Sequence, residues 1–119
     1  MDLIDVASEV RDSILQFRDN MEKLDTAGDR KAEAIAQYDL NLAKTIIKLR
    51  RGVEFKLEEE TVKSPPATLI PKVAAGICWR EKLELETSDA VYRNLIQALK
   101  SLEAQLNGWQ SILRRLDQV

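Results

Sequence analysis

The chain contains no histidine, a single cysteine and only four glycines among its 119 residues. The absence of histidine excludes a Ser-His-Asp triad, a Cys-His pair, a histidine general base and a Glu-x-x-His di-iron motif. The sequence also has no Gly-rich loop of the kind that binds phosphates. We therefore predict a protein that is not an enzyme and has no catalytic residues, no cofactor and no metal site.

Long hydrophobic runs and a strong charge of one sign are also missing. No apolar run approaches the roughly 20 residues that a membrane-spanning helix needs, and residues 1–5 lack the basic start and apolar centre of a signal peptide. The lone cysteine, Cys78, cannot form an internal disulfide, which agrees with a reducing compartment. The net charge of −2 excludes a strongly basic nucleic-acid-binding protein by composition alone. We expect a cytosolic protein without a membrane partner.

The strongest pattern that is present lies between Cys78 and Leu116. Hydrophobic residues make up 45% of the chain, which suits one folded, helix-rich domain over residues 1–119. In this stretch small and apolar residues recur in alternating steps of three and four, which predicts one face of a long helix that packs against another helix. We expect this second arm to span residues 77–118. Its stripe consists of Cys78, Leu85, Ser88, Tyr92, Leu95, Leu99, Leu102, Leu106, Trp109, Leu113 and Leu116.

The first arm, residues 1–51, carries a similar stripe. If a separate second helix followed Gly28 and folded back, its stripe would continue the heptad phase of the first helix by chance only about one time in seven. Because the phase persists beyond Gly28, we favour one helix weakened at Gly28 and Lys31, since an interior glycine costs only about 1 kcal/mol. The alternative is a break near Gly28 and a three-helix bundle. The stripe consists of Leu3, Ala7, Val10, Ile14, Phe17, Met21, Leu24, Ile35, Tyr38, Leu42 and Leu49, and Gly52 follows it.

The charge distribution agrees with a hairpin. Residues 1–28 carry seven acidic and three basic side chains, and residues 29–52 carry three and six. Residues 77–92 carry four acidic and two basic side chains, and residues 93–119 carry two and four. In an antiparallel hairpin, opposite charges therefore face each other at both ends, although a three-helix bundle also permits favourable pairing. We predict an all-α fold, a long antiparallel helical hairpin of the coiled-coil type, with the three-helix bundle as the alternative.

Residues 52–76 form the predicted connector, or tip. Val53–Leu57 alternates with period two, and residues 61–63 could form a short return strand. Pro65 and Pro66 mark a bend, and Thr68 could cap a short helical turn that Gly76 closes. A segment of this length is too long for a simple connection, so we expect it to be structured and to carry specificity.

Apolar side chains near the tip are the candidates for contact with a partner. Trp79 and Leu83 lie off the stripe of the second arm, and Leu69, Ile70 and Val73 are expected to cover them. The alternative is an exposed patch for another protein. Trp109 lies in the stripe and is expected in the core. The candidate partner-binding residues are Phe55, Leu69, Ile70, Trp79 and Leu83.

Charged residues and the cysteine allow other interpretations. Lys44, Lys48, Arg50 and Arg51 are candidates for binding nucleic-acid phosphates, whereas the simpler interpretation is that they offset the helix dipole and face the acidic start of the second arm. Residues 58–60, three consecutive glutamates, indicate a solvated run rather than a cation site. Cys78 lies on the stripe and is expected to be a small buried residue rather than a reactive thiol.

Three segments resemble a family of small helical proteins encoded by phages and prophages of Gram-positive bacteria. Residues 34–50 (AIAQYDLNLAKTIIKLR), 67–76 (ATLIPKVAAG) and 81–105 (EKLELETSDAVYRNLIQALKSLEAQ) carry the resemblance. It implies a Tyr-containing helix, a connector with a Thr-Leu-Ile turn and a long C-terminal helix. Residues 58–60 and the Cys78-Trp79 pair depart from the pattern. The resemblance implies no catalytic residue and an accessory protein of the host-cell cytosol that acts on another macromolecule.

Two functions are consistent with these features. The first is a non-enzymatic interaction factor, an inhibitor, adaptor or assembly chaperone, that presents residues 53–83 to a host or phage protein. The alternative is a nucleic-acid-binding accessory factor in phage replication or recombination. We also predict a homodimer with a four-helix arrangement, because a two-helix hairpin buries little surface. The apolar residues on its outer faces are Ile4, Ile47, Val91, Ile96 and Ile112.

Overall fold

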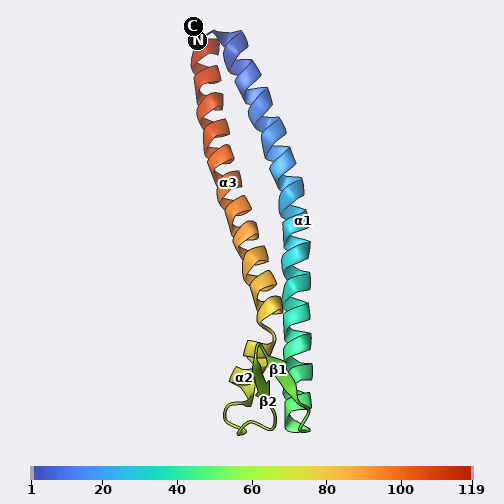
Figure 1. Cartoon of the computed structure of the whole chain (residues 1–119). Coiled ribbons are helices and arrows are strands. Elements are labelled where there is room, and N and C mark those ends of the chain that lie inside the picture. The colour runs from blue at the N-terminus through green and yellow to red at the C-terminus, as the bar shows by residue number, and fades with distance from the viewer. Residues whose placement is uncertain (1, 119) are drawn as a thin grey trace. The chain divides into compact units, whose positions relative to one another are not determined.

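The computed structural model describes residues 2–118, which form three helices and one two-stranded antiparallel sheet (Figure 1). These residues fall into two compact units. The helical unit combines the residues up to Gly28 with those from Ala90 onward, and the connector unit is Asp29–Asp89. None of the helices in the described part of the chain is long and apolar enough to cross a membrane. The elements are α1 (Leu3–Arg50), β1 (Phe55–Leu57), β2 (Glu60–Val62), α2 (Ile70–Ile77) and α3 (Trp79–Asp117).

Helix α1 runs through Gly28 without a break, so the predicted helical hairpin is confirmed and the three-helix bundle is wrong. At the start of α1 the Asp5 N–H donates a hydrogen bond of 2.9 Å to the Asp2 carboxylate. This bond satisfies one of the backbone N–H groups that have no partner within the first turn of a helix. At Gly28 the Tyr92 ring of α3 lies where a side chain would otherwise project, 3.4 Å from the position of a Cβ. Packing by Tyr92 thus compensates for the low helix propensity of glycine.

Gly52 ends α1, as predicted. Its φ of +83° is the left-handed conformation that glycine adopts without steric cost. The Gly52 N–H donates to the Leu49 carbonyl at 3.1 Å, and the Val53 N–H donates to the Lys48 carbonyl at 3.0 Å. These two bonds satisfy carbonyls of the last turn and direct the chain away from the helix axis.

The two stripes differ in how well the sequence predicted them. Every residue of the stripe predicted on α3 is buried or partly buried. On α1 the prediction is wrong at five positions, because Leu3, Ala7, Ile14, Met21 and Ile35 are exposed. The contact face is turned by one residue, so that the smaller Ser13 and Ala34 are buried in place of Ile14 and Ile35. The buried residues of α1 are Val6, Ser13, Ala27, Ala34, Thr45 and Leu49.

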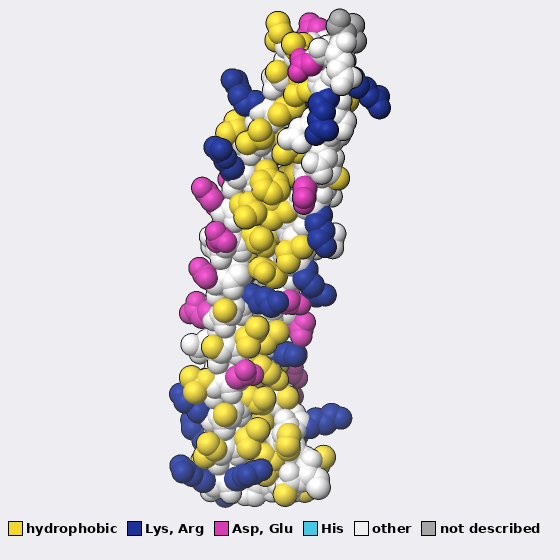
Figure 2. Space-filling view, turned by 180° about the vertical axis from the view of Figure 1, so that it is seen from behind, with side chains coloured by type: hydrophobic (Ala, Val, Ile, Leu, Met, Phe, Trp, Pro, Cys, Tyr) yellow, Lys and Arg dark blue, Asp and Glu magenta, His cyan; other side chains and the backbone are white. Residues whose placement is uncertain are grey.

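The helical unit has little fully buried core. Val6, Ser13, Ala27 and Leu99 are its buried residues within the described range. The remaining apolar residues on the contact face are only partly buried, because two helices alone cannot surround them. Figure 2 shows hydrophobic side chains gathered in a band between charged ones on the face that it displays.

The connector unit holds a denser core, which forms where the tip folds back against α1. The antiparallel strands pair Phe55 with Val62 and Leu57 with Glu60, so the predicted strand pair is confirmed. Contrary to prediction, Gly76 lies inside α2, where a Cβ would be 3.6 Å from the Leu57 side chain. A Cβ at this distance would make an ordinary van der Waals contact with Leu57, so the packing of the strands on α2 does not require a glycine here. The buried core is Leu49, Ile70 and Ala74, with Leu42, Ile46, Phe55, Val62, Val73 and Ile77 packed around it.

Polar contacts between α1 and α3 set their antiparallel register inside the connector unit. The Arg30 guanidinium lies 2.8 Å from the Glu84 carboxylate, and the Lys31 ammonium lies 3.0 Å from that of Asp89. The predicted pairing of the basic middle of α1 with the acidic start of α3 is therefore confirmed at these residues. Two further contacts between α1 and α3 fit the same antiparallel register, Tyr38 with Lys82 and Asn41 with Glu81, and Thr45 contacts Cys78 just before α3.

Candidate functional site

Trp79 and Leu83 form an exposed apolar pair at the start of α3. Their exposed fractions are 51% and 58%, so the prediction that the tip covers them is wrong. The segment expected to cover them packs elsewhere, because Ile70 is buried against Leu49 of α1 and Val73 packs against the same core. The tip thus completes the core beside α1 and leaves this pair in contact with solvent.

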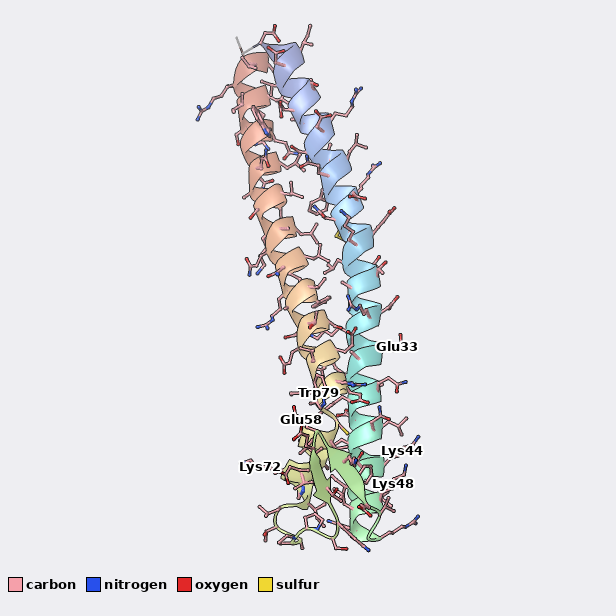
Figure 3. All side chains as sticks on the ribbon, in the orientation of Figure 1. Glu33, Lys44, Lys48, Glu58, Lys72 and Trp79 are labelled. Carbon is pink, nitrogen blue, oxygen red and sulfur yellow. The ribbon has the colours of Figure 1, made fainter. Side chains whose placement is uncertain are left out.

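A hollow of about 450 Å³ lies beside Trp79. Glu58 and Glu60 line it together with Leu57 and Gly76. Figure 3 shows Glu58 and Trp79 close together where the strands meet the start of α3. We call the lining residues and Leu83 the tip surface.

The strand turn places the two carboxylates of the tip surface. Glu58 and Glu59 form the turn between the paired residues Leu57 and Glu60. Glu58 has a φ of +55°, a left-handed conformation that costs a residue other than glycine about 1 kcal/mol or more. Residues 58–60 are exposed, as expected for a solvated run, and the turn places Glu58 and Glu60 at the same hollow. Within residues 2–118 neither of them forms an ion pair.

The tip surface combines an aromatic ring with negative charge. The Arg80 guanidinium lies 5.3 Å from the centre of the Trp79 ring, within the range of a cation–π contact. An exposed indole beside unpaired carboxylates attracts a further basic side chain, because both the ring face and the carboxylates favour positive charge.

The other predicted partner-binding residues are dispersed. Leu69 is exposed just before α2, whereas Ile70 is buried and Phe55 is partly buried in the core of the connector unit. Because Ile70 and Phe55 pack against the core, they support the tip and do not present their side chains to a partner. The structure therefore separates the supporting residues from the exposed pair of Trp79 and Leu83.

The basic residues near the end of α1 are exposed. Lys48 and Arg50 lie in the last turn of α1, as the interpretation from the helix dipole expects. They form no ion pair with the acidic start of α3, where other residues occupy the carboxylates. Glu84 pairs with Arg30, Glu86 pairs with Lys82, and Glu81 accepts a hydrogen bond from Asn41. Figure 3 shows two of the basic side chains on the side of α1 away from the tip. In the described part of the chain no ion pair involves Lys44, Lys48, Arg50 or Arg51.

A second hollow, of about 410 Å³, lies between α1 and α3 in the connector unit. Arg30 and Glu84 line it and neutralise each other. The hydrogen bond from Arg30 lowers the pKa of the Glu84 carboxyl, although its partial removal from water opposes the shift. The same hydrogen bond raises the pKa of Arg30. We assign no ligand to this hollow, since its lining carries charges of both signs.

Cys78 is buried, and its sulfur lies 3.4 Å from the Thr45 hydroxyl between α1 and α3, which supports the interpretation of a small buried residue. Trp109 is partly buried on the contact face of the helical unit. Among the described residues no group of histidine, cysteine, aspartate and glutamate side chains could hold a metal ion. Comparisons with protein-family models, with curated proteins and with solved structures give no match to this chain.

Proposed function

We propose that this protein is a non-enzymatic interaction factor of a phage or prophage of Gram-positive bacteria, which binds a host or phage protein through its tip surface. The observation that carries the proposal is the exposure of Trp79, which lines the hollow, and of Leu83 four residues further along α3. A large aromatic side chain left uncovered next to a hollow is the kind of anchor on which protein interfaces depend. The resemblance to phage-encoded helical proteins supports the biological setting.

The chemistry of the tip surface favours a partner segment with an apolar side chain and a lysine or arginine. The apolar side chain packs against Trp79 and Leu83, while the basic one approaches Glu58 and Glu60. The core beneath, built on Leu49, holds the strands and α2 in place before binding. Such a contact suits an inhibitor, an adaptor or an assembly chaperone.

Replacing Trp79 with alanine is expected to weaken partner binding by about tenfold or more, because central aromatic residues dominate interface energies. The full-length chain is first used to capture its partner from an extract of infected host cells. The purified partner is then titrated by calorimetry with the wild-type protein and with Trp79→Ala and Leu83→Ala. Leu15→Ala is the matched control, since Leu15 is equally exposed but lies in the helical unit. Unchanged affinity in both tip variants would count against the tip surface as the binding site.

A second candidate function is a nucleic-acid-binding accessory factor in phage replication or recombination. The specific observation in its favour is that Lys44, Lys48, Arg50 and Arg51 are exposed and form no ion pair within residues 2–118. Exposed cations on a helix end release counterions when they bind phosphates, which makes such binding depend on salt.

Salt-dependent retardation of single- or double-stranded DNA tests this second function. The double variant Lys48→Glu/Arg51→Glu is expected to weaken DNA binding by about tenfold or more, since two phosphate contacts become repulsive. The matched control is Arg114→Glu/Arg115→Glu at the end of α3. Absence of any DNA binding at low salt would remove this candidate, and an equal loss in the control would show that the effect is not specific to α1.

A further inference from the structure

Helix α1 carries a second stripe of alternating steps of three and four that its own chain does not cover. The stripe begins with an acidic residue, continues with alternating small and large apolar residues and ends with a basic residue. Its two large members, Leu40 and Ile47, have exposed fractions of 49% and 50%. We call this set the outer stripe; it consists of Glu33, Ala36, Leu40, Ala43, Ile47 and Arg50, all of which are exposed.

The apolar residues of the outer stripe lie on the side of α1 opposite to α3. Glu33 lies at the edge of the stripe, where it also lines the hollow that Arg30 and Glu84 share. Tyr38 and Asn41 contact α3, Thr45 contacts Cys78 just before α3, and Ala34 is buried. Each apolar residue of the outer stripe follows one of these four by two positions. Two residues correspond to about 200° around a helix with 3.6 residues per turn. The tip packs on a third side of α1, through Leu42, Ile46 and Leu49. The outer stripe is therefore left to solvent in the connector unit.

We propose that the outer stripe is the contact face for a second copy of the same chain, which pairs antiparallel about a two-fold axis. In this pairing Leu40 lies opposite Ala43 of the second copy, and Ala36 lies opposite Ile47. Glu33 lies opposite Arg50 of the second copy. Each contact occurs twice because a two-fold interface uses the same surface on both copies. Large side chains thus face small ones, and opposite charges meet at both ends.

Other arrangements of the same face are less favourable. A shift by seven residues in one direction places Ile47 opposite Asp29, and a shift in the other direction places Leu40 opposite Arg50. A parallel in-register pair places Glu33 opposite Glu33 and Arg50 opposite Arg50, so that like charges repel. The proposed register avoids all of these conflicts. Because the charges of the outer stripe complement those of an identical, antiparallel stripe, we infer that a second copy of the chain binds there.

The charges at the ends of the outer stripe are available for this contact. Neither Glu33 nor Arg50 forms an ion pair within the part of the chain that the structure describes. Figure 3 labels Glu33 on α1, several turns away from Lys44 and Lys48 on the same helix. Because exposed ion pairs contribute little free energy, the end charges select register and direction, while Leu40 and Ile47 supply the apolar contact.

This self-association does not depend on the proposed partner of the tip surface. Trp79 and Leu83 belong to α3, and the apolar residues of the outer stripe lie on the opposite side of α1. A pair formed through the outer stripe therefore leaves the tip surface of both copies uncovered and makes the proposed interaction factor bivalent.

Sedimentation equilibrium of the full-length chain over a series of concentrations tests the proposal. We expect a monomer–dimer equilibrium in which Ile47→Lys and Glu33→Arg each raise the dimer dissociation constant by about tenfold or more. The charge exchange Glu33→Arg/Arg50→Glu is expected to restore the dissociation constant to within about threefold of wild type, because opposite charges again meet. Leu15→Lys is the matched control on the same helix and is expected to leave the dissociation constant unchanged.

Two outcomes would overturn the proposal. One is a chain that stays monomeric throughout the concentration series. The other is a dimer that neither Ile47→Lys nor Glu33→Arg weakens, which would place the interface on another face or assign the outer stripe to a different protein. Circular dichroism of each variant confirms that the helices remain folded, and the double variant separates lost charge pairing from lost structure.

Discussion

Replacement of Leu49 with alanine is expected to lower the free energy of unfolding by about 3 kcal/mol, because truncation of a buried leucine removes apolar burial and leaves a cavity. Leu49 is 1% exposed and contacts the tip core through Ile70 and Ala74. The strands and α2 depend on this contact, since they hold few other buried residues. Urea unfolding followed by circular dichroism measures the change.

The matched control for Leu49→Ala is Leu83→Ala in the same unit. Leu83 is 58% exposed, so the same truncation there is expected to change the free energy of unfolding by no more than about 0.5 kcal/mol. Comparable losses in the two variants would show that the tip does not pack on α1 as described. A selective loss in Leu49→Ala would also support the assignment of Ile70 to the core.

The sequence predicted α3 better than α1, and side-chain size explains the difference. On α3 the residues in contact with α1 are mostly the large apolar ones, so hydrophobic periodicity alone located them. On α1 the close contacts use Ser13, Ala27 and Ala34, which allow the helix backbones to approach. Larger neighbours such as Ile14 and Ile35 then remain at the margins of the contact. A prediction based on hydrophobicity selects these larger neighbours, and it therefore places the contact face of α1 one residue away from its true position.

The continuity of α1 was predictable because the apolar stripe keeps the same heptad phase on both sides of Gly28. Tyr38 and Leu49 kept the phase of the first residues across Gly28, and they are partly or fully buried in the structure. The glycine alone suggested a break. What the sequence could not provide was the Tyr92 ring, which packs against Gly28 from a position far along the chain.

The candidate site was only partly predictable. The positions of Trp79 and Leu83 off the stripe indicated that α1 would not cover them. Whether the tip would cover them depended on where Ile70 packs. Ile70 packs against Leu49 of α1, a contact between residues distant in the sequence that local sequence does not predict. The hollow with Glu58 and Glu60 also escaped prediction, because it depends on the conformation of a two-residue turn.

The half-buried ion pair between Lys31 and Asp89 is expected to contribute more to the register of α1 and α3 than the more exposed pair between Arg30 and Glu84. The Lys31 and Asp89 groups lie 3.0 Å apart, and their side chains are 31% and 25% exposed. Partial burial reduces screening by salt, so this pair is worth more than an exposed pair. Lys31 also occupies the contact face of α1, where an unpaired charge is unfavourable. The pair therefore favours the one alignment in which the two charges meet.

Reversing one charge, as in Asp89→Lys, is expected to lower the free energy of unfolding by about 2 kcal/mol, less than the 3–5 kcal/mol typical of a fully buried pair. The exchanged pair Lys31→Asp/Asp89→Lys is expected to recover the loss to within about 1 kcal/mol, because the charges are again opposite. Glu86→Lys serves as control, since Glu86 pairs with Lys82 on an exposed surface. Urea unfolding of the wild type and the three variants measures the loss of stability and its recovery. If Asp89→Lys costs no more than Glu86→Lys, or if the exchange restores nothing, the register is set by the apolar contacts alone.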